Sequence, residues 1–118
     1  YAGIKELMNI VGPSYAKEIF FTGKRFNAAE AEMMGLINRV VPFSELKSTV
    51  TSYARTIADN APLTVKAAKA AVNEGTKNPE ERDLDKVAAL VEACFNSSDY
   101  KEGRRAFMEK RPPRFQGR

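Results

Sequence analysis

Apolar residues recur every three or four positions along most of this chain, which is the spacing of one face of an α-helix. Between residues 44 and 59, Leu46, Val50 and Ile57 share such a stripe, and polar side chains occupy the opposite side. Glycine, proline and capping residues mark where each pattern begins and ends. The predicted helices cover residues 3–11, 13–22, 28–35, 44–59, 62–75, 79–95 and 98–110.

Several helix ends have a local physical reason. Gly12 and Pro13 fit the end of one helix and the start of the next, because glycine tolerates a left-handed backbone and proline suits the first helical position. Asn27 and Glu30 have the spacing of a capping box, in which each side chain binds the other residue's backbone N–H. Pro79 is expected to open the longest helix of the chain.

One segment suggests a strand. The run from Leu36 to Val41 is too short for a helix and contains β-branched residues, so it is either a short strand or an extended connection. The predicted fold class is therefore all-α, with at most this one strand. Cys94 falls on an apolar stripe with Val91 and Phe95 and is expected to be a buried, unreactive thiol rather than a nucleophile.

Composition excludes several classes of function. The 118 residues fit one domain or part of one, 43% of them are hydrophobic, and no apolar run reaches the length of a membrane span. With one Cys and no His, the chain has neither a disulfide framework nor the usual zinc-ligand spacings, and a reducing compartment is expected. The chain opens at Tyr1 without an initiator Met, so its true N-terminus is expected upstream.

Charge is concentrated at one end. The formal net charge is +4, and residues 101–118 hold seven basic residues against Glu102 and Glu109. Such a basic end suits nucleic acid, anionic lipid or a phosphorylated cofactor, and equally a solvated surface. No phosphate-binding glycine loop, metal cluster or nucleophile elbow is present, and the carboxylates expected to be solvated or capping are Glu6, Glu18, Glu30, Glu32, Glu45 and Glu80.

Four ordered segments nevertheless resemble one family. They are VGPSYAKEIFFTGKRF (11–26), AAEAEMMGLINRVVP (28–42), IADNAP (57–62) and DYKEGRRAFMEKRPPRF (99–115). Together they resemble the C-terminal portion of the crotonase family, the enoyl-CoA hydratases and isomerases. The resemblance implies that the full-length family combines an α/β spiral with a helical trimerisation domain. Residues 1–42 would be the helical end of the spiral core, and residues 43–118 the C-terminal helical region.

The resemblance also implies where the chemistry lies. In the family, the backbone donors that stabilise the enolate and the catalytic carboxylates lie in the N-terminal half, so no catalytic residue is expected in this chain. Ala2-Gly3 would match a glycine pair just after the second carboxylate region. Phe107 and Lys110 match positions that contact the adenine and phosphates of CoA, and their spacing of about one turn would place them on one helical surface.

The expected function is that of an enoyl-CoA hydratase-like lyase or isomerase whose substrate is a CoA thioester, with hydration of 2-enoyl-CoA favoured and no prosthetic group. The expected partners are acyl-CoA and further copies in a trimer or hexamer, without membrane or nucleic acid, in the bacterial cytoplasm rather than the mitochondrial matrix. Residues 4–7 depart from the Thr-Gln-Arg-Leu of many hydratases, which leaves the exact reaction open. The alternatives are a stand-alone helical interaction module and RNA binding through the basic end.

Overall fold

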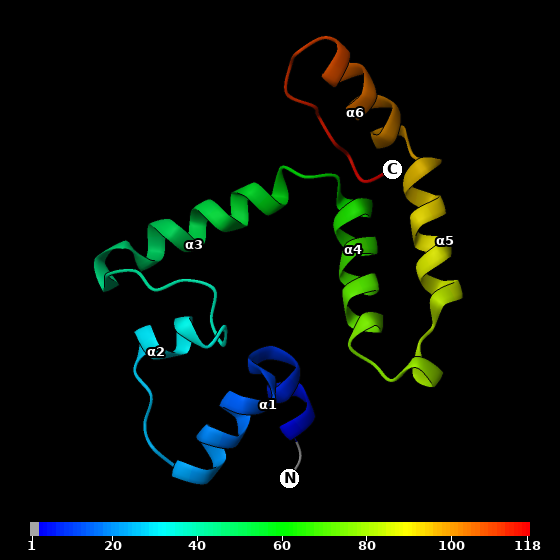
Figure 1. The fold of residues 1–118 in the computed structure, drawn as a ribbon. Helices are drawn as coiled ribbons and strands as arrows, with labels where there is room; N and C mark the ends of the chain where they lie inside the picture. Colours follow the sequence, from blue (N-terminus) through cyan, green and yellow to red (C-terminus); the bar gives the residue numbers. More distant parts are fainter. Residues whose placement is uncertain (1–2) are drawn as a thin grey trace. The chain divides into compact units, whose positions relative to one another are not determined.

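The computed structural model describes residues 3–118, and within them every regular element is helical (Figure 1). The predicted all-α class is confirmed. The elements in order are α1 (Ile4–Thr22), α2 (Ala28–Met33), α3 (Phe43–Ala58), α4 (Pro62–Gly75), the 3₁₀ turn η1 (Pro79–Glu81), α5 (Leu84–Phe95) and α6 (Ser98–Met108).

The chain divides into two compact units, residues 1–47 and residues 48–118. The dividing point lies inside α3, whose first turn belongs to unit 1 and whose remainder belongs to unit 2. The assignment of residues 1–42 to the end of a spiral core and of residues 43–118 to an assembly region stays a prediction.

Unit 1 is organised around a break in α1. Gly12 has φ 76° and ψ 166° in the middle of this helix, and Pro13 follows it, so the two predicted helices meet there at a kink. The break folds the two halves of α1 around a small apolar core. Its buried members are Val11, Ala16 and Met34, with Leu7, Tyr15, Ile19 and Phe26 packed against them.

The predicted capping box begins α2. The Asn27 side chain accepts a hydrogen bond of 2.9 Å from the Glu30 N–H, and the Glu30 carboxylate accepts one of 2.9 Å from the Asn27 N–H. Gly35, with φ 76°, ends the turn that follows α2. Residues 36–42 form bends and irregular backbone and not the possible strand, and the Val40 N–H donates to the Glu32 carboxylate at 3.1 Å.

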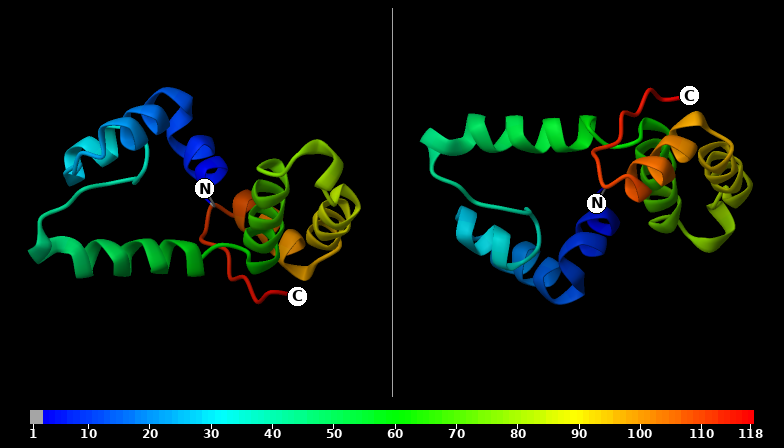
Figure 2. Two further views of the ribbon diagram at one scale, coloured as in Figure 1. Left: turned by 90° about the horizontal axis from the view of Figure 1, so that it is seen from below. Right: turned by 90° about the horizontal axis from the view of Figure 1, so that it is seen from above.

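In unit 2, α4 and α5 lie side by side and antiparallel (Figures 1 and 2). The single helix expected from Pro79 to Phe95 is wrong, and α5 is not the longest helix: Arg82 adopts an extended conformation that separates η1 from α5. Asp83 then starts α5 by accepting the Lys86 N–H at 2.9 Å. The buried carboxylate of Glu74 closes this connection, since it accepts the Asp83 N–H at 2.9 Å.

After α5, Ser97 caps α6 by accepting the Tyr100 N–H at 3.0 Å, as the sequence predicts. Residues 112–118 then run back along α6 toward its N-terminus (Figures 1 and 2). We call these residues the C-terminal strap. Its end reaches α4 as well, since Gly117 lies against the ring of Pro62.

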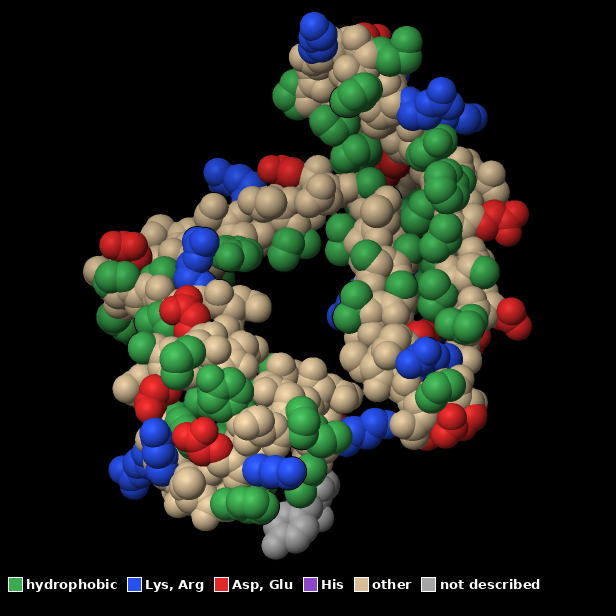
Figure 3. Space-filling view, viewed as in Figure 1, with side chains coloured by type: hydrophobic (Ala, Val, Ile, Leu, Met, Phe, Trp, Pro, Cys, Tyr) green, Lys and Arg blue, Asp and Glu red, His purple; other side chains and the backbone are tan. Residues whose placement is uncertain are grey.

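Many large apolar side chains remain exposed. Figure 3 shows hydrophobic side chains along the α4 and α5 side of unit 2. The exposed apolar residues of these two helices include Val72, Val91 and Phe95. The expectation that Cys94 is buried is wrong: its thiol is free and partly exposed, and Val91 and Phe95 on the same stripe of α5 are exposed as well. None of the described helices is long and apolar enough to span a membrane.

Candidate functional site

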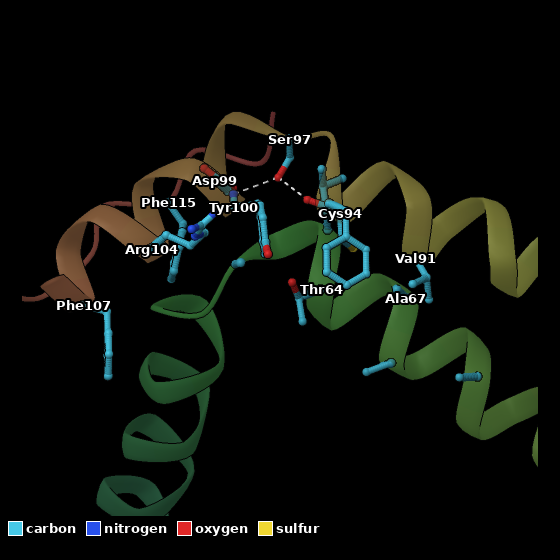
Figure 4. A pocket seen from close by; sticks show the side chains of 16 residues that line it. Thr64, Ala67, Val91, Cys94, Ser97, Asp99, Tyr100, Arg104, Phe107 and Phe115 are labelled. Carbon is cyan, nitrogen blue, oxygen red and sulfur yellow. Dashed lines mark hydrogen bonds between the residues drawn. The ribbon is translucent and has the colours of Figure 1, made fainter.

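A groove with a volume of 630 Å³ lies within unit 2, between α4, α5, α6 and the strap (Figure 4). Its α4 side includes three small residues, Ala67, Ala68 and Ala71, which leave room beside the helix, together with Leu63 and Thr64. The remaining lining side chains are mostly apolar or aromatic and include Val91, Cys94, Phe95, Tyr100, Phe107 and Phe115.

The groove is shaped where α5 turns into α6. The rings of Phe95 and Tyr100 meet edge to face, with centroids 5.2 Å apart. Ser97 fixes this corner, because its hydroxyl donates to the Cys94 carbonyl at 2.6 Å while accepting the Tyr100 N–H. The Arg104 guanidinium lies over the Tyr100 ring, 5.9 Å from its centroid, and adds a cation to the groove lining.

Phe107 and Lys110, the two residues expected to bind CoA, lie at the C-terminal end of α6. Phe107 lines the groove and is 86% exposed, which is unusual for a phenylalanine. Lys110 does not share a helical surface with it, because α6 ends at Met108 and Lys110 has a left-handed backbone, φ 54°. The Lys110 N–H donates to the Phe107 carbonyl at 3.2 Å, so the two residues are still neighbours.

An ion-pair cluster holds the same end of the helix. The Arg111 guanidinium makes two hydrogen bonds to the Glu102 carboxylate, of 2.7 and 3.1 Å, and a third of 2.6 Å to Glu109. Arg105 adds a bond of 2.7 Å to Glu102. The Arg111 and Arg105 side chains and the Arg114 N–H hold the pKa of Glu102 far below its usual range, and Glu102 and Glu109 raise the pKa of Arg111.

A second carboxylate of α6 holds the strap. Asp99, only 3% exposed, accepts the N–H groups of Gln116 and Gly117 at 2.7 Å each. Sequence reasoning missed both Asp99 and Glu102 as anchors. Their separation of three residues, with Gly103 directly after, could have indicated a single face of α6 able to receive a returning segment.

Two further carboxylates, Glu30 and Glu74, also act as acceptors. The pKa values of Glu30 and Glu74 are lowered, chiefly by Lys24 and Lys77 respectively and then by backbone N–H donors. A lowered pKa suits charge pairing and is the opposite of what a general acid needs near neutral pH. Among residues 3–118, no group of acidic, histidine or cysteine side chains could hold a metal ion.

The family follows from comparison with known proteins. A family model described as enoyl-CoA hydratase/isomerase matches residues 1–118. The chain belongs to the enoyl-CoA hydratase/isomerase family. The resemblance read from the four sequence segments is thereby confirmed.

The names of similar proteins agree with this family membership. It is 38% identical over 115 residues to the crotonyl-CoA hydratase of Syntrophomonas wolfei, which covers 98% of this chain and 44% of the relative. It is also 38% identical over 111 residues to a probable mitochondrial enoyl-CoA hydratase of Dictyostelium discoideum, covering 94% of this chain and 40% of that one. The relatives thus include bacterial and mitochondrial proteins, and the chain spans less than half the length of each of these two.

Solved structures of enoyl-CoA hydratases share the fold of this family member. The crystal structure from Bacillus anthracis matches with a TM-score of 0.85 and 33% identity, over 98% of this chain and 45% of that one. The one from Geobacillus kaustophilus matches with a TM-score of 0.84 and 37% identity, over 100% of this chain and 46% of that one. The helices described here are therefore a helical portion of the crotonase fold.

Proposed function

We propose that this chain is the C-terminal part of an enzyme that adds water to 2-enoyl-CoA thioesters, and that it supplies the surface for the nucleotide end of CoA. The observation that carries the proposal is the exposed Phe107 ring with Lys110 immediately beyond the helix end. An adenine has a flat π face that stacks on an aromatic ring, and a lysine ammonium binds phosphate by charge-assisted hydrogen bonds.

The relatives support the reaction. One of them is named a crotonyl-CoA hydratase and another a short-chain-enoyl-CoA hydratase. Hydration needs donors that stabilise an enolate oxygen and groups that move protons. The 118 residues contain no histidine, and the perturbed carboxylates Glu30, Glu74 and Glu102 have lowered pKa values. We therefore propose that the reacting groups belong to the rest of the whole protein and that this chain alone is inactive.

Activity measurements test whether the reacting groups lie outside this chain. The purified 118-residue chain, assayed with crotonyl-CoA, should hydrate it at least about 100-fold more slowly than a complete hydratase, since loss of even one oxyanion donor costs about that much. The Syntrophomonas wolfei crotonyl-CoA hydratase is the matched reference. A rate from the pure chain near that of the reference would place the catalytic groups within these residues and contradict the proposal.

The CoA contact is tested in the whole protein that carries this chain. Lys110→Ala should raise the KM for crotonyl-CoA roughly tenfold and leave kcat little changed, because the contact is remote from the reacting carbon and similar in ground and transition states. Lys101→Ala, which removes an exposed cation of α6 outside the groove lining, is the control for general charge. Equal increases for both variants that vanish at moderate salt would indicate long-range attraction by the basic end instead.

Phe107 has its own matched control in the next residue. Phe107→Ala should raise KM several-fold, since base stacking on an aromatic ring is worth about 1–3 kcal/mol. Met108, 80% exposed, is as accessible as Phe107 but presents no ring. Met108→Ala should therefore leave KM unchanged, and an equal effect of both truncations would refute the stacking.

The family and the exposed apolar surface also bear on the oligomeric state, the compartment and RNA binding. We propose that the whole protein is a homo-oligomer, a trimer or a hexamer, because unit 2 leaves apolar side chains such as Val91 and Phe95 uncovered. A reducing compartment, the bacterial cytoplasm, suits the free Cys94 thiol. RNA binding has less support, since Arg105 and Arg111 already pair with Glu102.

A further inference from the structure

Lys110 occupies a backbone conformation that lysine disfavours. In residues 3–118 it is the only non-glycine residue with positive φ, at 54°. The Arg111 N–H donates to the Ala106 carbonyl at 3.1 Å and the Lys110 N–H to the Phe107 carbonyl at 3.2 Å, which is the hydrogen-bond pattern of a Schellman motif. The residue in the Lys110 position of this motif is usually glycine, because a side chain there crowds the backbone.

The residue after Lys110 is held unusually firmly. The Arg111 guanidinium forms a two-point bond with Glu102, whose side chain is only 13% exposed, and also binds Glu109 and the Pro112 carbonyl. A planar fork bound at two points fixes direction as well as distance. Residues on both sides of Lys110 are thereby fixed to α6, and the turn cannot relax without breaking these bonds.

We propose that Glu102 and Arg111 are positioning residues that hold Lys110 in its left-handed conformation, so that its ammonium is presented beside the Phe107 ring. The proposal rests on the proposed CoA site, and adds to it the residues that set its geometry. Backbone strain is concentrated where a side chain is needed for function. A lysine in a glycine position, with an ion pair fixing the next residue, fits that principle.

The physical benefit is a lower cost of binding. A lysine side chain loses much conformational freedom when it is ordered against an anion, and a mobile backbone would add to that loss. The Glu102 to Arg111 pair fixes the backbone before the ligand arrives, so only the side chain remains to be ordered. Loss of the Glu102 to Arg111 pair should therefore weaken CoA binding, and it should do so only when the Lys110 side chain is present.

Glu102 has a second role, as an anchor of the strap, which an experiment must distinguish from positioning Lys110. Its carboxylate also accepts the Arg114 N–H at 3.0 Å, so it anchors the strap as well. Loss of the strap would destabilise unit 2 whether or not Lys110 binds anything. A double-mutant cycle distinguishes the two roles, because coupling between residues that do not touch requires a shared element.

The experiment measures Kd for free CoA by calorimetry, and the melting temperature, in the whole protein. Lys110→Gly should weaken CoA binding about tenfold while raising the melting temperature by about 2–4 °C, since glycine relieves the left-handed strain. Glu102→Gln should weaken binding about threefold in the native background and have no further effect in the Lys110→Gly background. Glu92→Gln, which removes an exposed carboxylate of α5, should leave Kd unchanged.

Three results would overturn the inference. If Glu102→Gln weakened binding by the same factor in both backgrounds, Glu102 would not act through Lys110, although the CoA contact would stand. If Lys110→Gly left Kd unchanged, the proposed CoA contact itself would be wrong, and the positioning role with it. Should Glu102→Gln fail to fold, Arg111→Lys replaces it, because lysine keeps the charge and loses the two-point bond; additive effects of Arg111→Lys and Lys110→Gly would be equally decisive against the proposal.

Discussion

The ring of Phe115 lies against Gly103, so that a Cβ on Gly103 would stand 3.5 Å from the nearest ring carbon. That is an ordinary contact distance, which one methyl group can occupy but a larger side chain cannot. The strap is therefore packed on α6 at a residue that is helical and has no side chain of its own. This contact makes the size of residue 103 a direct probe of strap packing.

Gly103→Ala should stabilise unit 2 by about 0.5–1 kcal/mol, because alanine favours the helix and the Phe115 ring leaves room for it. Gly103→Leu should destabilise it by more than about 1 kcal/mol by displacing the ring. Urea unfolding of the chain measures both changes. Gly75, helical and open to solvent, is the control, and Gly75→Leu should cost far less than Gly103→Leu.

The Glu102 pairing should make stability depend on pH. Its folded pKa lies well below the ordinary 4.5, so the unfolded chain binds more protons below that pH and stability falls as pH falls. The contribution is present in full above about pH 5.5 and is lost progressively toward pH 2. Glu102→Gln should therefore be less stable at pH 7 and lose less stability on acidification, as measured by urea unfolding at each pH. Identical slopes for Glu102→Gln and Glu92→Gln would contradict this assignment.

Removing the Asp99 acceptor should loosen the strap. Asp99→Asn places an amide NH₂ where the carboxylate now receives two backbone N–H groups, so one buried donor loses its partner, at a cost of about 1–3 kcal/mol. Hydrogen exchange at Gln116 and Gly117 should speed up at the same time. Asp85→Asn, in the first turn of α5, should cost only a few tenths of a kcal/mol and leave those two amides unchanged.

The exposed stripe of α3 should drive self-association of the chain. Leu46, Val50 and Ile57 all lie on this helix and are exposed. Burying about 100 Å² of apolar surface is worth about 2.5 kcal/mol, so an uncovered stripe favours contact between copies. Sedimentation at tens of micromolar should show mainly species larger than the 13.1 kDa monomer. Val50→Glu should increase the monomer fraction, Lys47→Glu should not, and a purely monomeric native chain would refute the prediction.

Local signals in the sequence predicted most of the helices. Asn27 and Glu30 form the capping box that their spacing indicates, and Gly12 breaks α1 where two helices were expected to meet. These outcomes depend on neighbours a few residues away. For that reason, the conformational preferences of single residues are enough to predict them.

Prediction from the sequence failed where contacts between distant residues, or competing local conformations, determine the structure. The pattern from residue 79 to 95 suits a continuous helix, but Asp83 gains more as a cap bonded to Lys86 and to buried Glu74, which shortens α5. The left-handed turn at Lys110 opposes the residue's own preference, and the residue that directly follows it belongs to the Glu102 to Arg111 pair that we propose to hold it. Periodicity cannot show that pair, because it joins a helix to a loop nine residues away.

The strap also sets an order of events in folding. Residues 112–118 are translated after every partner they touch, including Pro62 on α4 and Asp99 and Gly103 on α6. Before the strap packs, the Asp99 carboxylate lacks its two backbone donors and the groove lacks its Phe115 wall. Packing of the strap joins residues far apart in sequence, for example Asp99 and Gln116, so we expect it to be slow relative to helix formation. A chain truncated before residue 112 would lack the Phe115 wall and leave this groove open along α6.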